Sequence, residues 1–158
     1  MAALLAIPET LKAAPKIAPF PHLYRVRLDA CETGAVLLAP PRPLLLGGAP
    51  AEFGGTDDRW SPEHLLLASA SLCLRETFGS LAQLKHLAVE SYQSDAHALL
   101  DRTATGPAFA WIKISVDLRV APSEVERARA LLDKAKQHCI VTNSLRIPVQ
   151  LEATLNGA

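Results

Sequence analysis

Alternating apolar and polar residues predict strands in the first third of the chain. Residues 23–31 (LYRVRLDAC) alternate along their whole length, which is typical of a half-buried strand. Residues 32–34 (ETG) favour a turn, and residues 35–39 return as a second strand. The prolines that follow prevent continued pairing, and a short apolar run at residues 44–46 completes a group of three strands. Residues 47–59, with four glycines, form a loop.

The next segment predicts one long helix over residues 61–85. Ser61 is a suitable N-cap, Pro62 suits the first helical position, and Glu63 faces the positive end of the helix dipole. Leucines and alanines occupy the whole circumference of this helix, so its middle should be buried on all sides. Since a small domain rarely buries a helix so fully, we expect a second copy of the chain to cover it.

The last third alternates strands and a helix. Residues 87–100 and 109–120 read as two strands joined by a hairpin at residues 105–107. Ser123 and Glu126 form a capping box for a second helix that reaches His138, and residues 145–155 form a last strand. The order β-β-β-α-β-β-α-β lacks a regular βα alternation and predicts an α+β fold. We assign residues 1–22 to an N-terminal extension and 23–158 to one domain.

Composition narrows the class of protein. The 158 residues are 49% hydrophobic and 20% charged, which excludes a disordered chain. Sixteen basic residues balance sixteen acidic ones, so no electrostatic footprint for nucleic acid is present. Three cysteines favour reduced thiols in the cytoplasm over a secreted disulfide scaffold. The longest uncharged apolar stretch, residues 64–74, is shorter than the roughly 18 residues of a membrane span, and Pro8 and Glu9 interrupt any signal peptide.

Cysteines are the main candidates for chemistry. Free cysteine usually packs as a small apolar residue, and Cys31 on its alternating strand fits that role. Cys73 in the first helix and Cys139 at the end of the second are flanked by polar residues, yet their spacing alone does not show that they meet. A metal site with His64, His86 and His138 lacks any ligand motif, and no serine-hydrolase elbow occurs. We therefore expect neither metal nor organic cofactor.

Two segments resemble the OsmC/Ohr family of organic hydroperoxide reductases. They are residues 52–78 (EFGGTDDRWSPEHLLLASASLCLRETF) and residues 138–145 (HCIVTNSL). A Pro-Glu pair opens the long helix, and a cysteine follows ten residues after that glutamate. A second cysteine ends the second helix and precedes Asn-Ser. The resemblance implies an OsmC-like fold in which two long helices pack inside an intertwined homodimer.

The same resemblance implies a mechanism. Cys73 is the peroxidatic thiol, Cys139 the resolving thiol, and Glu63 the glutamate that orients an arginine towards the reactive sulfur. The protein would reduce organic hydroperoxides to alcohols through a sulfenic acid and a disulfide, which a dithiol reductant, of lipoyl type or another, would reopen. Because Glu63 and Cys73 are about 15 Å apart along the helix, a link between them needs a loop arginine or the other subunit.

One departure from the family concerns that arginine. The loop GGAPAEFGG before the Pro-Glu pair contains none, so Arg59 is the nearest candidate, with Arg42 behind it and Arg25 and Arg27 on a strand. Ile140 also replaces a proline common after the second cysteine. Two alternatives to a peroxidase stay open. The protein could be a non-enzymatic binder of a small apolar ligand, or a redox sensor that uses the same disulfide.

Overall fold

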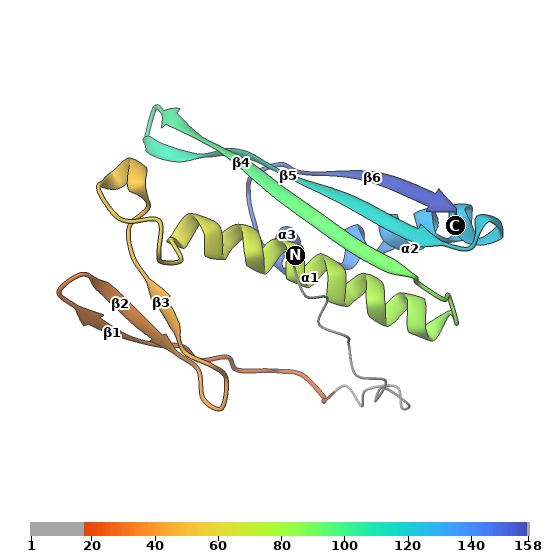
Figure 1. The fold of residues 1–158 in the computed structure, drawn as a ribbon, viewed down its shortest axis with the longest axis horizontal. Helices are drawn as coiled ribbons and strands as arrows, with labels where there is room; N and C mark the ends of the chain where they lie inside the picture. The colour runs from red at the N-terminus through yellow and green to blue at the C-terminus, as the bar shows by residue number, and fades with distance from the viewer. Residues whose placement is uncertain (1–17, 158) are drawn as a thin grey trace.

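Residues 18–157 of the computed structural model form two three-stranded sheets, one of which is covered by helices (Figure 1). In chain order the elements are β1 (Arg27–Cys31), β2 (Gly34–Leu38), β3 (Leu45–Gly47), the 3-10 turn η1 (Ala51–Phe53), α1 (Pro62–Leu84), β4 (Ser91–Thr103), β5 (Gly106–Val120), the 3-10 turn η2 (Pro122–Glu124), α2 (Val125–His138), α3 (Ile140–Asn143) and β6 (Val149–Gly157). This mixture confirms the predicted α+β class. Most of the predicted N-terminal extension lies outside the described residues.

The sheet β4-β5-β6 supports the hydrophobic core. β4 pairs with β5 in antiparallel register and β6 runs parallel to β5, which places β5 in the middle. Every second residue of β5 from Ile112 to Val120 is buried, whereas the intervening residues from Trp111 to Arg119 are not, as the alternation predicts. The buried face packs against α1 and α2, whose buried residues belong to the same core cluster.

Helix α1 begins as the sequence predicts, because the Ser61 hydroxyl accepts a hydrogen bond from the His64 amide at 3.2 Å. Its buried residues recur every four positions, at Ala70, Leu74, Phe78 and Ala82. Two large apolar residues of this helix, Leu72 and Leu84, face outward within the protomer and are 61% and 68% exposed. One protomer therefore buries a single stripe of the helix, and the all-round burial predicted from its sequence is not reached within a single chain.

The sheet β1-β2-β3 stands apart from this core (Figure 1). It is tied to the segment before α1 by backbone hydrogen bonds, from Trp60 N to the Leu46 carbonyl at 3.0 Å and from Gly48 N to the Trp60 carbonyl at 3.1 Å. Large apolar side chains on and beside it are exposed, among them Leu28, Leu44, Leu46, Phe53 and Trp60. An exposed apolar group of this size is typical of an interaction surface.

Several boundaries differ from the sequence predictions. The two long strands span Ser91–Thr103 and Gly106–Val120 instead of residues 87–100 and 109–120, so the turn between them lies at residues 104–105 and not at 105–107. The first strand is shorter than residues 23–31 and begins at Arg27. Ser123 does not cap the second helix, because it lies inside η2, and α2 begins at Val125 without a side-chain cap. The last strand begins at Val149 instead of residue 145, because the chain after Cys139 first makes the short helix α3.

Helix α1 has one further property, which is that it is long and apolar enough to cross a membrane. It has 23 residues and a mean hydropathy of 1.2 over its most apolar window. Buried core helices of folded domains have the same length and composition, and α1 packs on α2 and β4. The expectation that no segment spans a membrane stays a prediction.

Candidate active site

Cys73 lies near the middle of α1, one residue before the buried Leu74, and its side chain is partly exposed. Its own carbonyl accepts a hydrogen bond from the Thr77 hydroxyl at 2.8 Å, one turn further along the helix. Because Ala70 and Leu74 are buried against the core, the neighbouring Cys73 side chain points towards α2 and α3.

Cys139 ends α2 and is fully buried. It has extended backbone angles (φ −68°, ψ 106°), which stop α2 and let α3 start at the next residue. This reversal aims the first amides of α3 back at α1. The Val141 N–H donates to Cys73 Sγ at 3.5 Å, and the Cys73 and Cys139 side chains interact directly. The structure thus brings together the two cysteines, which are 66 positions apart in the sequence.

The surroundings of Cys73 favour a protonated thiol within one protomer. Burial has the largest effect and raises the pKa of Cys73 above its ordinary value. The Val141 amide lowers this pKa because it donates to the sulfur, the Cys139 side chain raises it, and the Ile140 amide lowers it slightly. Within residues 18–157, no cationic side chain is among the groups that shift the pKa. A nucleophilic thiolate would therefore need a positive charge from outside the described residues.

Glu63 lies at the other end of the site, in the first turn of α1. It is partly buried, and its Oε2 atom is buried without a hydrogen-bond partner. The residue lines an apolar groove of about 690 Å³ between the β1-β2-β3 sheet and the start of α1, together with Leu28, Phe53 and Trp60. Because a buried carboxylate without a partner is costly, this position is suited to receive a cation.

Arg59 lies beside the β1–β2 turn and does not contact Cys73. Its Nη2 atom donates to the Thr33 hydroxyl at 2.9 Å, and its Nε atom lies 3.8 Å from Asp58. Its side chain is only 18% exposed and packs against Gly48, where an added Cβ would lie 3.1 Å from Arg59 Cδ. In one protomer the two thiols therefore form one cluster. Arg59 and Glu63 are separate from that cluster, since Arg59 lies before α1 and Glu63 lies in its first turn.

Two of the other arginines considered from the sequence are also engaged elsewhere. Arg27 forms an ion pair with Asp29 at 2.8 Å, and Arg42 donates to the Ala39 carbonyl at 3.4 Å. Within the described part of the chain, no group of three or more His, Cys, Asp or Glu residues is arranged to hold a metal ion.

Tyr92 is a site residue that the sequence analysis missed. Its ring packs on Phe78 with centroids 5.8 Å apart, and its hydroxyl is buried without a well-formed hydrogen bond. Burial raises the pKa of Tyr92 to about 12, nearby Ser94 and Arg75 lower it, and Cys139 raises it. The hydroxyl thus lies within electrostatic range of both the Arg75 guanidinium and the Cys139 sulfur. A tyrosine near the start of a strand carries no motif, so no sequence signal marked it.

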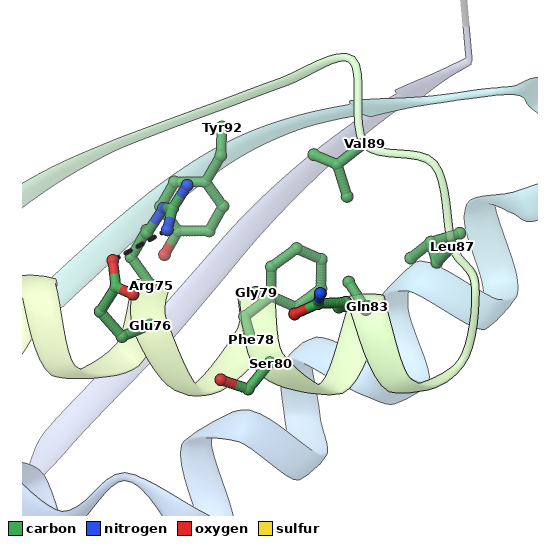
Figure 2. Close-up of a pocket in the computed structure, with 10 residues that line it drawn as sticks. Arg75, Glu76, Phe78, Gly79, Ser80, Gln83, Leu87, Val89 and Tyr92 are labelled. Atoms are coloured by element: carbon green, nitrogen blue, oxygen red, sulfur yellow. Dashed lines mark hydrogen bonds and ion pairs between the residues drawn. The ribbon is translucent and has the colours of Figure 1, made fainter. Parts of the chain in front are cut away.

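Arg75 and Tyr92 both line a cavity of about 490 Å³ between α1 and β4. Figure 2 shows the Tyr92 side chain reaching from β4 towards α1, where Arg75 forms an ion pair with Glu76 at 2.8 Å. The remaining walls are mostly apolar, from Phe78, Leu87 and Val89. Arg75 is therefore a cation within electrostatic range of the buried Tyr92 hydroxyl.

Sequence comparison places this arrangement in a family. Residues 55–154, which include both thiols, Glu63 and Arg59, match the family described as OsmC-like protein. The chain belongs to the OsmC-like family. None of the curated proteins matches it.

Solved structures of OsmC-like proteins share the fold. An OsmC-like protein of unknown function from Vibrio cholerae superposes with a TM-score of 0.78 at 15% identity, over 85% of this chain and 100% of the other. An organic hydroperoxide resistance protein from Elizabethkingia anophelis gives 0.69 at 17% identity, over 88% and 100%. A hydroperoxide resistance protein, OsmC, from Legionella pneumophila gives 0.67 at 19% identity, over 86% and 99%. These superpositions confirm the OsmC-like fold, which the sequence predicted. Because the identities are low, the chemistry has to be argued from the residues of this chain.

Proposed function

We propose that this OsmC-like protein is a cysteine-based peroxidase that reduces organic hydroperoxides to alcohols. The observation that carries the proposal is the contact between the two thiols, with the Val141 amide bonded to Cys73 Sγ. Two structural relatives are described as organic hydroperoxide resistance proteins, which supports the same class of substrate. Thiols that must return to the reduced state also suit a reducing compartment such as the cytoplasm.

The reaction has three balanced steps. The Cys73 thiolate attacks the distal peroxide oxygen, the O–O bond breaks, and the alkoxide takes a proton to leave as alcohol. The resulting Cys73 sulfenic acid condenses with the Cys139 thiol, forming the disulfide and releasing water. A dithiol reductant then reduces this disulfide by two thiol–disulfide exchanges and is itself oxidised to a disulfide. No step needs a metal or an organic cofactor.

The activating cation comes, in this proposal, from a second copy of the chain. Among residues 18–157, no cationic side chain shifts the pKa of Cys73, and the buried Oε2 atom of Glu63 has no hydrogen-bond partner. The exposed apolar residues Leu72 and Leu84 on α1, and those of the β1-β2-β3 sheet, provide surface for a homodimer. In such a dimer Glu63 of one chain would position an arginine, Arg59 in our assignment, towards the Cys73 thiol of its partner.

A thiol assay with purified protein tests the proposal. Reduced protein is mixed with cumene hydroperoxide, and free thiols and remaining peroxide are followed over minutes. We expect loss of two thiols per chain and peroxide consumption, with turnover once a dithiol such as dihydrolipoamide is added. Cys73→Ser should abolish the reaction, whereas Cys31→Ser, on an exposed strand residue, is the matched control and should react like the wild type.

Two outcomes would contradict the peroxidase proposal. Thiols that survive excess peroxide would exclude it, as would undiminished turnover by Cys73→Ser. A disulfide that forms without turnover would point instead to a redox sensor. Light scattering on the same sample tests the homodimer, and a monomer at micromolar concentration would remove the source that we propose for the cation.

A second function is favoured by one observation, the apolar groove of about 690 Å³ beside Glu63. In a non-enzymatic binder this groove would hold a small acyl or aromatic ligand, and the cysteines would only pack. Native mass spectrometry distinguishes the non-enzymatic binder from the peroxidase. A co-purified ligand on a protein with inert thiols supports the binder, and an empty protein with reactive thiols supports the peroxidase.

A further inference from the structure

Helix α3 lies directly against the two thiols. It starts at the residue after Cys139, and its Val141 N–H donates to Cys73 Sγ at 3.5 Å. Cys139 is 0% exposed within one protomer, and a second copy of the chain can only bury it further. In the proposed homodimer Cys73 faces an arginine of the partner chain. Because thiol–disulfide exchange needs access to a sulfur, a reductant reaches the disulfide only if the chain beside it moves.

The attachment of α3 to the rest of the protomer is light. Its four residues are far fewer than a helix needs to be stable alone, its N-terminus has no side-chain cap, and its one buried residue is the polar Thr142. Among residues 18–157, two hydrogen bonds join α3 to α1 and α2. They run from Val141 N to Cys73 Sγ at 3.5 Å and from Asn143 Nδ2 to the Gln137 carbonyl at 2.7 Å. One of the two therefore depends on the state of the Cys73 sulfur.

Disulfide formation changes that sulfur in two ways. The two sulfurs must approach to about 2.05 Å with a restricted dihedral angle, whereas Cys73 Sγ now accepts the Val141 N–H. Because Cys139 is held in a close-packed core, the movement falls mainly on Cys73. The sulfur also becomes neutral and divalent, and it is then a weaker acceptor than the thiolate. Both changes weaken the bond that ties α3 to α1.

The two ends of the segment stay fixed when α3 moves. Before it, Cys139 is buried in the core, and after it, the Pro148 carbonyl accepts a hydrogen bond from the Ile112 amide of β5 at 3.0 Å. Opening is thus confined to residues 140–147 and leaves α2 and the β4-β5-β6 sheet intact. Native proteins undergo local movements of this size without unfolding globally.

We propose that α3 is a redox-operated lid, which the Cys73–Cys139 disulfide releases from α1 and which admits the dithiol reductant when open. The inference rests on the disulfide of the proposed function. One thiolate of the reductant bonds to a sulfur of the disulfide, and the other protein sulfur leaves with the electron pair. The second thiolate of the reductant then displaces the remaining protein sulfur, which leaves two protein thiols and an oxidised reductant. The Val141 N–H returns to Cys73 Sγ, and the lid closes.

Hydrogen exchange followed by mass spectrometry tests the release of α3. Cys31→Ser protein is oxidised with diamide, which makes the disulfide whether or not the protein reacts with peroxide, and is compared with reduced protein. We expect amides of residues 140–143 to exchange about fivefold faster after oxidation, the effect of one lost hydrogen bond, and those of β5 to be unchanged. Cys139→Ser in the same background is the control and should not respond to diamide. Equal exchange in the oxidised and reduced protein would overturn the proposal.

Asn143→Ala tests whether opening controls reduction. The substitution removes the 2.7 Å bond to the Gln137 carbonyl, which holds α3 closed. Diamide-oxidised protein in the Cys31→Ser background is reduced by dithiothreitol, and thiols are trapped by alkylation at timed intervals. We expect Asn143→Ala to be reduced about fivefold faster than the parent protein. Asn156→Ala, which loses a 3.1 Å bond to Asp117 on the sheet, is the matched control and should keep the parent rate.

The lid and the peroxidase fail on different results. An Asn143→Ala protein that is reduced at the parent rate would overturn the lid, as would a protein that forms no disulfide with diamide. Failure of peroxide to oxidise the wild type would contradict only the proposed function, since diamide supplies the disulfide in these tests.

Discussion

The backbone N–H of Val141 donates to Cys73 Sγ at 3.5 Å, which links the first turn of α3 to the middle of α1. This bond places the chain segment that follows Cys139 directly against the other thiol. Because it stabilises the thiolate, the bond works against the effect of burial, which raises the pKa of Cys73. The α2–α3 reversal therefore sets both the meeting of the two sulfurs and part of the reactivity of Cys73.

Removing this amide should make Cys73 less reactive. Val141→Pro deletes the N–H in the first turn of α3, where a proline is tolerated because the amide has no intrahelical partner. Val141→Ala keeps the N–H and is the matched control. We expect alkylation of Cys73 by iodoacetamide at pH 8 to slow about threefold in the proline variant only. If Val141→Ala and Val141→Pro slow the alkylation of Cys73 equally, the valine side chain is responsible and the amide N–H is not.

Oxidation should stabilise the fold. A bond between Cys73 and Cys139 closes a loop of 66 residues, for which chain entropy predicts about 4 kcal/mol of added stability. Urea unfolding of diamide-oxidised protein, compared with protein kept reduced by a phosphine, measures this difference in the free energy of unfolding. An oxidised form that unfolds at lower urea concentration would mean that the disulfide strains the α1–α2 contact.

The fold was largely readable from the sequence. Alternation along residues 109–120 predicted the buried face of β5, and Ser61 with Pro62 predicted the start of α1, since both signals are local. The capping box at Ser123 failed because η2 precedes α2 and takes that residue. Helix α3 was missed because four residues give no periodic signal, and its position depends on packing against α1.

The candidate site was only partly predictable. Cys73 and Cys139 were found through the resemblance to a family, but spacing could not show that they meet, because their contact depends on how α2 ends against α1. Tyr92 was missed because its raised pKa arises from burial in the tertiary structure, within electrostatic range of Arg75 and Cys139, which are distant in the sequence. Sequence patterns identify elements well and identify contacts between elements poorly.

Glu63→Gln should slow peroxide reduction without unfolding the protein. The glutamine keeps the shape of the side chain but removes the charge that would orient an arginine. We expect the second-order rate of Cys73 oxidation by cumene hydroperoxide to fall about tenfold, with an apparent melting temperature within a few degrees of wild type. Glu52→Gln, on an exposed residue of η1, is the matched control and should leave the rate unchanged. A wild-type rate for Glu63→Gln would remove Glu63 from the site.

Arg59 and Arg42 can be separated by the same assay. If Arg59 of a partner chain activates Cys73, Arg59→Ala should lower the oxidation rate at least tenfold, which is a typical effect for a charge beside a thiolate. Because Arg59 also holds the Thr33 hydroxyl at 2.9 Å, circular dichroism must show that the variant is folded. Arg42→Ala, which loses one long contact to the Ala39 carbonyl, should react at the wild-type rate. The reverse pattern would assign the cation to Arg42.

Alkaline unfolding should reveal the buried Tyr92. Its pKa is raised to about 12 in the folded protein, so the unfolded chain loses this proton first as the pH rises, and stability falls between about pH 10 and pH 12. Allowing for solvent screening at a partly buried group, the loss amounts to roughly 1–2 kcal/mol. Urea unfolding at pH 9 and pH 11 measures it, and Tyr92→Phe should lose less stability over this interval than Tyr24→Phe. Cys73 also has a raised pKa, but both variants retain it, so their difference isolates Tyr92. Equal losses in the two variants would mean that the Tyr92 hydroxyl reaches water in solution.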